Sequence, residues 1–240
     1  MSAHFQILPR DFYSRSTILV AIDLVGKILL HRTNRGSLTG KILEVEAYLG
    51  ESDPACHASR GRTKRTHVFW QGHGRAYVFL NYGIHHCLNA ITCDSGSPGC
   101  VLIRAVEPLG NVNLMKENRG IHDSRIIANG PGKLTQAFGI TLEHNGVDLT
   151  EGDLVILRQE DREEMMVTSR IGISKAEKEP LRFCNCSTIT TYSSSRRSTL
   201  FFKGTREQVK KAFNEGTLRT AVGPRAYERS LQMHRKVVNI

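Results

Sequence analysis

The amino-acid sequence predicts an α+β fold, and two observations support this prediction. A chain of 240 residues, 40% of them hydrophobic, is long enough to bury a substantial core in one large domain. Strand-like segments linked by short turns occur along most of the chain, together with a smaller number of helix-like segments. The sequence contains no internal repeats or low-complexity tracts.

The first predicted elements are a helix and a pair of strands. Thr17–Val25 is typical of a short helix that stops at Gly26. The apolar strand Lys27–His31 follows, and the turn Asn34–Ser37 joins it to a second strand at about Thr39–Ala47. This order indicates a hairpin or a meander.

A long polar segment separates the first elements from the later ones. Ser52–Gly74 is basic and contains glycine, which predicts a long loop, and loops of this length in compact domains are often functional. Further strands are expected at Tyr77–Tyr82, His86–Thr92, Cys100–Val106 and Asp153–Leu157, and helices at Asn111–Arg119, Pro131–Phe138 and Thr205–Glu215. Proline opens the second of these helices and Gly139 follows it, whereas a Thr-x-x-Gln capping box opens the third.

The composition indicates a basic protein. Thirty-three Lys and Arg residues against 23 Asp and Glu residues give a net charge of +10. A basic surface favours polyanions, of which nucleic acid is the commonest, although many enzymes that act on acidic metabolites are basic too. The longest apolar stretch, around Thr17–Leu30, is interrupted by charged residues and glycine, so we expect no contact with a membrane. The N-terminus lacks the pattern of a signal peptide, which favours a cytosolic or nuclear location.

The six cysteines do not form a recognisable metal motif. None of them makes a C-x-x-C pair, and without a secretion signal they are expected to be reduced thiols. Cys184 and Cys186 could bind a metal together with His85 and His86, but this spacing matches no common zinc pattern. We therefore expect neither a metal nor a cofactor.

Two acidic residues near the end of a strand are candidates for acid–base chemistry. Glu44 and Glu46 point to the same face of a strand, and two neighbouring acids each raise the other's pKa, which suits proton abstraction near neutral pH. Tyr48 lies on the same side and would place an aromatic ring beside a carboxylate. The alternative is an edge strand whose outward face simply carries charge.

The long loop carries a histidine and a run of cations. His57 is followed by Arg60, Arg62, Lys64 and Arg65. This run could be a solvated loop, but an imidazole followed by four cations also suits a ligand that has both a base edge and phosphates.

The segment YVFLNYGIHHCLN at Tyr77–Asn89 indicates an aromatic-rich strand–turn–strand. Tyr82 would then lie near the tip beside Gly83, where a large ring is poorly placed for core packing. An aromatic residue at such a tip is a candidate wedge that enters the minor groove of DNA. Tyr77 and Phe79 alternate on one face and could line a pocket, or they could be ordinary cross-strand aromatic neighbours.

These segments occur in the same order in a known family. From about Asp11 to Phe183 the chain resembles the alkyladenine (3-methyladenine) DNA glycosylases. The markers are GKILEVEAYLG, HASRGRTKRT, YVFLNYGIHHCLN, VLIRAVEPL and GPGKLTQA, with the closing segments Arg170–Ile173 and Glu179–Phe183. The resemblance implies a single compact domain with a curved, mostly antiparallel sheet, flanking helices and a protruding β-hairpin.

The resemblance also implies an activity, namely hydrolysis of the N-glycosidic bond of a damaged purine that has been flipped out of double-stranded DNA. Glu46 would activate the attacking water, and Arg104 would orient Glu46 and this water. Tyr48, His57 and Phe79 would form a sandwich around the purine, and Tyr82 would be an intercalating wedge. Asn89 would form the pocket floor and help to exclude the amino group of guanine. The loop cations would contact DNA. The implied enzyme is a monofunctional monomer without a cofactor, located with the nucleoid in a bacterium or in the nucleus of a eukaryote.

Two positions depart from the family pattern. Phe79 stands where the family often has tyrosine, and tyrosine is also common at the position of His85, which leaves the exact base preference open. Residues 1–186 are expected to form the glycosylase domain, whereas residues 187–240 form an extension of unknown role. Two other functions remain alternatives: a DNA-distorting protein without catalytic activity, and a hydrolase of free nucleosides.

Overall fold

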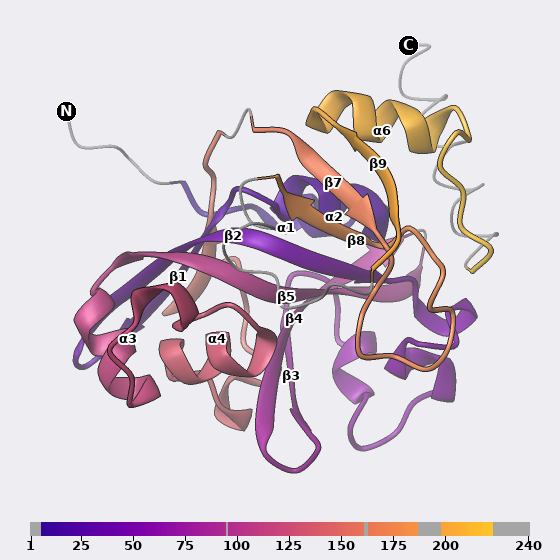
Figure 1. Cartoon of the computed structure of the whole chain (residues 1–240). Coiled ribbons are helices and arrows are strands. Elements are labelled where there is room, and N and C mark those ends of the chain that lie inside the picture. The colour runs from indigo at the N-terminus through magenta and orange to yellow at the C-terminus, as the bar shows by residue number, and fades with distance from the viewer. Residues whose placement is uncertain (1–5, 95, 161–162, 187–197, 223–240) are drawn as a thin grey trace.

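In the computed structural model, which describes residues 6–94, 96–160, 163–186 and 198–222, the chain is built around one curved antiparallel sheet (Figure 1). The strands are β1 (Ile28–Thr33), β2 (Gly36–Tyr48), β3 (Ala76–Asn81), β4 (His85–Asp94), β5 (Ser97–Gly110), β6 (Leu154–Leu157), β7 (Met165–Thr168), β8 (Arg182–Asn185) and β9 (Leu200–Gly204). Within the described residues their order is β3-β4-β5-β2-β8-β7-β9, with β1 paired to both β2 and β6. The predicted α+β fold is therefore confirmed.

Strand β2 is the centre of this arrangement because it bends. One of its edges pairs with β5 along most of its length, and register shifts occur near Ile42 and Glu44. Its other edge pairs with β1 through the first half of the strand and with β8 at Glu44–Glu46. Bulges of this kind bend a strand and re-aim its side chains. The second half of β2 consequently carries its glutamates into the interior, and the alternative of a solvent-exposed edge strand is wrong.

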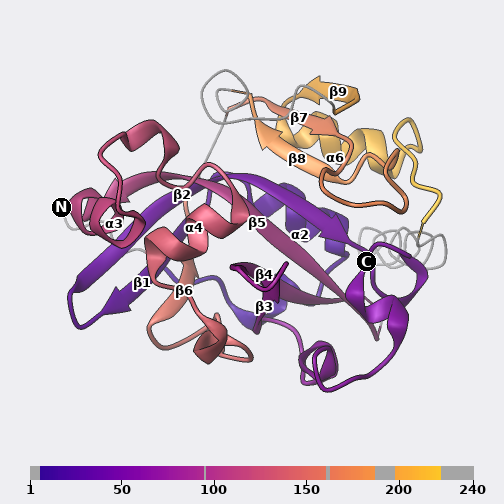
Figure 2. The same cartoon turned by 60° about the horizontal axis from the view of Figure 1, so that its bottom comes forward.

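The helices cover the sheet and close the core. They are α1 (Arg10–Tyr13), α2 (Thr17–Leu24), α3 (Val112–Arg119), α4 (Pro131–Phe138) and α6 (Arg206–Asn214). Every residue of α2 is buried, which agrees with its mostly apolar sequence, and its one charged residue, Asp23, pairs with Arg15. Helices α3 and α4 lie together on the side of the sheet from which the β3–β4 hairpin projects (Figure 2).

Helix α4 packs against strand β4 of that hairpin. Pro131 occupies its first turn and Gly139 ends it in a left-handed conformation with φ of 66°, as the sequence predicts. The hydroxyl of Thr135 donates a hydrogen bond of 2.9 Å to the carbonyl of His86 in β4. This contact supports the hairpin close to its turn, because His86 is the second residue of β4.

The expected long loop is more ordered than its sequence suggests. Residues between β2 and β3 form three short 3-10 helices, η1 (Gly50–Ser52), η2 (His57–Arg60) and η3 (His67–Trp70). Their apolar side chains build a second small core under the loop together with residues of β2 to β5. Two further 3-10 helices, η4 (Ser124–Ile126) and η5 (Leu142–His144), connect elements around α4.

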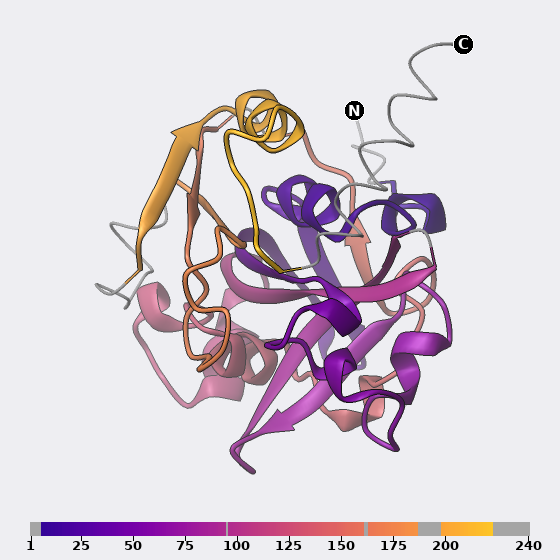
Figure 3. The ribbon, with the colours of Figure 1, turned by 90° about the vertical axis from the view of Figure 1, so that its right-hand side faces the viewer.

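The described part of the C-terminal extension joins the same sheet and core. Strand β9 pairs with β7, and α6 buries Val209, Ala212 and Phe213 after the predicted capping box of Thr205 and Gln208. The view in Figure 3 shows α6 at the end of the molecule opposite the hairpin. The boundary expected after residue 186 stays a prediction, and residues 187–197 and 223–240 lie outside the described residues.

Candidate active site

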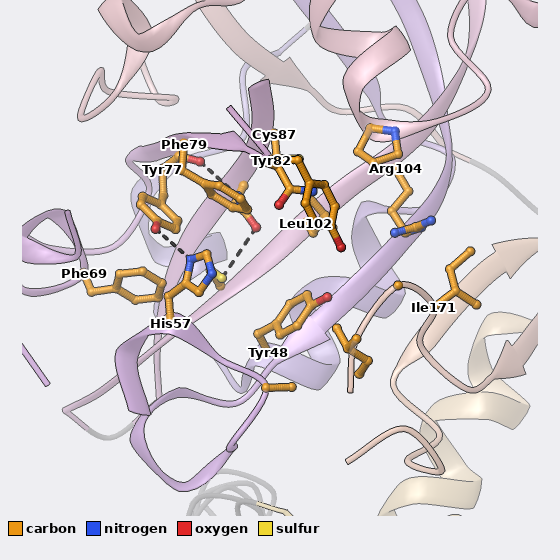
Figure 4. Close-up of a pocket in the computed structure, with 17 residues that line it drawn as sticks. Tyr48, His57, Phe69, Tyr77, Phe79, Tyr82, Cys87, Leu102, Arg104 and Ile171 are labelled. Atoms are coloured by element: carbon orange, nitrogen blue, oxygen red, sulfur yellow. Dashed lines mark hydrogen bonds between the residues drawn. The ribbon is translucent and has the colours of Figure 1, made fainter. Parts of the chain in front are cut away.

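A pocket of about 270 Å³ opens beside the hairpin, and its wall gathers residues that are far apart in the sequence (Figure 4). The lining comes from the end of β2, the η1–η3 loops, strands β3 to β5, the start of α4 and the loop after β7. Of the residues predicted from the sequence, Tyr48, His57, Phe79, Tyr82, Asn89 and Arg104 line it. An aromatic, half-enclosed pocket with a few convergent polar groups is the usual form of a binding site for a small molecule.

Glu46 lies directly behind this wall and has no solvent-exposed surface. Its Oε1 accepts a hydrogen bond of 2.9 Å from the backbone N–H of Ile171, and its Oε2 accepts one of 2.8 Å from the hydroxyl of Tyr48. A guanidinium nitrogen of Arg104 lies 3.4 Å from Oε2. All three of these neighbours line the pocket, so the carboxylate is one side chain away from any ligand there.

Glu44 has a different role from the one predicted. Its Oε1 accepts hydrogen bonds from the Nε atoms of Arg104, at 2.7 Å, and Arg182, at 2.8 Å. Burial alone would raise its pKa, but these two guanidinium groups hold the pKa of Glu44 below its usual value. The prediction that the neighbouring acids raise each other's pKa is therefore wrong for Glu44, which is an ionised partner that holds Arg104 in place.

Tyr48 forms one aromatic wall of the pocket. Burial and the neighbouring carboxylate of Glu46 raise its pKa well above the usual value. The phenol therefore stays protonated and acts as a hydrogen-bond donor. The guanidinium of Arg170 lies 4.8 Å from the centre of the same ring and does not line the pocket, so it supports the ring from behind.

His57 and Phe79 form the facing wall. Their ring centres are 4.7 Å apart in an edge-to-face arrangement, and Nδ1 of His57 lies 2.8 Å from the hydroxyl of Tyr77. Burial, with the nearby charges of Arg65 and Arg60, lowers the pKa of His57 to about 4. The imidazole is consequently neutral at physiological pH and can both donate and accept hydrogen bonds.

Asn89 is buried at the inner end of the pocket. Its Nδ2 donates a hydrogen bond of 3.0 Å to the carbonyl of Tyr77, its cross-strand neighbour in the β3–β4 hairpin. The thiol of Cys100 lies 3.7 Å from its Oδ1. These contacts fix the orientation of the amide within the lining.

Tyr82 stands at the tip of the hairpin, as its position beside Gly83 predicts. Its side chain is 83% exposed, and Ile84 beside it is 72% exposed. Tyr82 and Gly83 have φ angles of 51° and 70°, and the N–H of Ile84 donates to the carbonyl of Asn81, features typical of a tight type I′ turn. A bulky residue in the left-handed region is unusual and often marks a functional position.

The loop cations lie on the surface next to the pocket. Arg60, Arg62, Lys64 and Arg65 are all exposed. Arg65 also stacks on Phe79, with its guanidinium carbon 4.8 Å from the ring centre. This group can therefore support an aromatic wall and still present charge to a polyanion.

Sequence reasoning missed the residues that connect the pocket walls. Arg170 and Asp53 form a fully buried ion pair with two hydrogen bonds, 2.5 and 3.0 Å long. Ile171 supplies the backbone donor to Glu46. A basic residue directly before a pocket-lining segment was the only signal available, and its acidic partner is 117 residues away in the sequence.

The described residues contain no group of three or more His, Cys, Asp or Glu side chains that could hold a metal ion. Cys184 is buried in β8, and burial raises the pKa of its thiol, as does the nearby charge of Glu44. In the part of the chain that the structure describes, no helix is long and apolar enough to cross a membrane.

Comparison with known proteins gives one consistent result. The model of the methylpurine-DNA glycosylase family matches residues 11–188. The chain is 45% identical over 181 residues to a protein of Methanoculleus marisnigri named "Putative 3-methyladenine DNA glycosylase", which covers 73% of this chain and 93% of that protein. A protein of the same name from Carboxydothermus hydrogenoformans is 43% identical over 180 residues, covering 74% of this chain and 94% of its own. One from Chlorobium phaeobacteroides is 45% identical over 172 residues, covering 70% and 86% respectively.

Proposed function

The chain belongs to the methylpurine-DNA glycosylase family, and we propose that it flips damaged purines out of duplex DNA and hydrolyses their N-glycosidic bond with a water activated by Glu46. The observation that carries this proposal is the position of Glu46, fully buried and hydrogen-bonded to Tyr48 behind an aromatic pocket. A DNA-binding protein without catalytic activity has no use for a carboxylate there.

The first step is extrusion of the damaged nucleotide. The exposed ring of Tyr82 enters the DNA stack at the lesion and fills the gap that the base leaves. Flipping costs a few kcal/mol, and it costs less for a damaged or mispaired base, which adds selectivity. The exposed cations of the η2–η3 loop neutralise phosphates beside the pocket, so binding to the duplex weakens steeply with salt.

The second step is capture of the purine between the aromatic walls. Tyr48 faces His57 and Phe79 across the pocket, and stacking of a base on an aromatic ring contributes about 1–3 kcal/mol. The neutral imidazole of His57 presents no charge against a cationic alkylated base. Asn89 at the inner end offers a fixed amide that selects among purine edges.

The third step is attack by water. A carboxylate has about four acceptor positions, and close hydrogen bonds from Ile171 and Tyr48 occupy two of those on Glu46. The remaining positions, next to the longer contact with Arg104, are where a water entering from the pocket can be deprotonated. Alkylation at N3 or N7 makes the purine cationic, so it leaves with little need for protonation.

The pocket lining supports a one-step hydrolase. None of the described residues that line the pocket is a lysine, so no amine is at hand to form a covalent imine with the sugar. We therefore propose a monofunctional enzyme that leaves an intact abasic strand. Separately, we propose that it acts as a monomer.

The direct test is an excision assay without added metal. The protein is incubated with duplexes that contain 7-methylguanine, 3-methyladenine or hypoxanthine, and with the corresponding free nucleosides, and the released bases are identified. We expect free base from duplex, no strand cleavage, and no turnover of nucleosides. Turnover of the nucleosides at a comparable rate would contradict the proposal and favour the nucleoside hydrolase.

A further inference from the structure

Arg170 is buried beneath the pocket and makes contacts on several sides. Its two terminal nitrogens donate to the carboxylate of Asp53, and one of them also donates to the backbone carbonyl of Ala47, 3.0 Å away. The other lies 3.4 Å from the carbonyl of Ala176. Its Nε has no hydrogen-bond partner among the described residues, and its guanidinium lies against the ring of Tyr48.

Asp53, the partner of Arg170 in the ion pair, also accepts hydrogen bonds from the backbone. One of its oxygens accepts the N–H of Leu49 and the other accepts the N–H of Ala55, each at 3.1 Å. Leu49 follows the end of β2, and Ala55 lines the pocket just before His57. A single carboxylate with no exposed surface thus joins the end of β2 to the start of the η2 loop.

The ion pair therefore connects three separate walls of the pocket. Strand β2 brings Glu46 and Tyr48, the loop after Asp53 brings His57, and the segment after Arg170 brings Ile171, whose N–H donates to Glu46. Arg170 contacts the backbone of Ala47, which lies between Glu46 and Tyr48. In the close-up, Tyr48 and Ile171 flank one side of the pocket and come from different chain segments (Figure 4).

We propose that Arg170, through its buried pairing with Asp53, is a positioning residue that holds Glu46 and the Tyr48 ring in their relative orientation for bond hydrolysis. This inference rests on the proposed function. Arg170 does not line the pocket, so it acts through Tyr48, Ala47 and Ile171 and not by touching the purine. The planar guanidinium is needed because it forms two hydrogen bonds with a carboxylate and also lies over an aromatic ring, and an ammonium group cannot do both.

The proposal predicts which kinetic quantity changes when Arg170 is replaced. Groups that act only through orientation change the rate of the chemical step, since small displacements of a reacting group cost large factors in rate. We expect them to leave binding of duplex DNA intact, because Tyr82 and the loop cations are exposed on the surface, whereas Arg170 is buried. We therefore expect substitution of Arg170 to lower the rate of base excision without changing the affinity for duplex DNA.

The test compares Arg170→Lys, Arg170→Met and Asp53→Asn with a matched control, Arg15→Lys. Arg15 forms an ion pair with Asp23 on α2, at 2.8 Å, and does not line the pocket. For each protein we would measure thermal stability, the single-turnover rate of 7-methylguanine release, and the Kd for a duplex that carries a stable abasic-site analogue. All measurements are made well below the melting temperature.

We expect Arg170→Lys and Asp53→Asn to lose at least about tenfold in rate while the Kd stays within about threefold, and Arg15→Lys to keep the parental rate. Arg170→Met should lose as much as Arg170→Lys or more. A parental rate in Arg170→Lys would overturn the inference. A fall in rate that is matched by the control, or by an equal loss of affinity, would overturn it too, because the role would then be structural. If the parent protein releases no base, the proposed function itself fails, and this outcome is distinct from the others.

Discussion

The hydroxyl of Tyr48 donates a 2.8 Å hydrogen bond to Oε2 of Glu46, so an aromatic wall of the pocket and the buried acid behind it are directly linked. Both residues lie at the C-terminal end of the bent strand β2 and are separated by one residue. Because the phenol keeps its proton, it is a permanent donor to the carboxylate. We expect a purine that stacks on this ring to lie close to the acid.

This link predicts the effect of Tyr48→Phe. The variant keeps the stacking surface but removes one donor to Glu46, and a hydrogen bond to a charged group contributes about 1.5–3 kcal/mol. We expect the single-turnover excision rate to fall by about tenfold or more, with the affinity for a duplex containing an abasic-site analogue unchanged. Tyr48→Ala is the comparison variant, and it should lose stacking as well. Equal rates for Tyr48→Phe and the parent would show that the hydroxyl plays no part.

The histidine of the facing wall predicts a pH dependence of stability. Its pKa of about 4 in the folded protein lies below the value of 6.5 that is usual for histidine. The unfolded chain therefore binds a proton at His57 between these pH values while the folded chain does not, so this site lowers the free energy of unfolding as pH falls from about 6.5 to 4. NMR titration of the His57 ring should show a neutral imidazole at pH 6. Arg65→Gln should move its pKa upward because a neighbouring positive charge is removed, and an unchanged pKa would refute this cause.

From the position of Tyr82 at the hairpin tip we expect its substitution to weaken DNA binding without lowering the free energy of unfolding. Tyr82→Gly removes an exposed side chain from a left-handed position, so the free energy of unfolding should stay the same or rise by up to about 1 kcal/mol. Affinity for a lesion-containing duplex should fall by about 1–3 kcal/mol if the ring fills the vacated stack. Chemical denaturation and fluorescence anisotropy measure the two quantities. Loss of stability without loss of affinity would mean that the ring packs and does not intercalate.

The contact between helices α6 and α2 leads to a prediction about stability alone. Arg206 of α6 donates hydrogen bonds to the carbonyls of Ile22 and Val25 at the end of α2, and its side chain is 11% exposed. Arg206→Ala leaves these carbonyls without that donor and should lower the free energy of unfolding by about 2 kcal/mol. Lys211→Ala, on the exposed face of the same helix, should change it by less than about 0.5 kcal/mol. Equal effects of the two substitutions in denaturant titrations would show that α6 is only loosely attached.

Local patterns in the sequence were enough to predict much of this arrangement. The alternation of Glu46 and Tyr48 along a strand, the proline and glycine that bound α4, and the glycine next to Tyr82 at a turn are all signals within a few residues. The family was recognisable from the order of such segments, and the comparisons confirm it. The roles assigned to individual side chains remain predictions that the variants above test.

Features that depend on distant partners could not be predicted in this way. The partner of Arg170 lies 117 residues earlier in the chain, and Glu44 is 138 residues from Arg182, so neither ion pair has a local signature. The lowered pKa of Glu44 follows from those partners, and the two neighbouring acids alone suggested the opposite shift. The short strands β7, β8 and β9 have four or five residues each, too few to show a clear alternation.

The most direct test of the central claim is the substitution Glu46→Gln, assayed for release of free base from an alkylated duplex under single-turnover conditions. The amide oxygen can still accept from the N–H of Ile171, whereas its NH2 group replaces the oxygen that accepts from Tyr48. The amide cannot take a proton from water, so the rate should fall by a factor of about 10²–10⁴. The Kd for the same duplex should be unchanged or lower. Release of base by the variant at the parental rate would show that Glu46 does not activate the water.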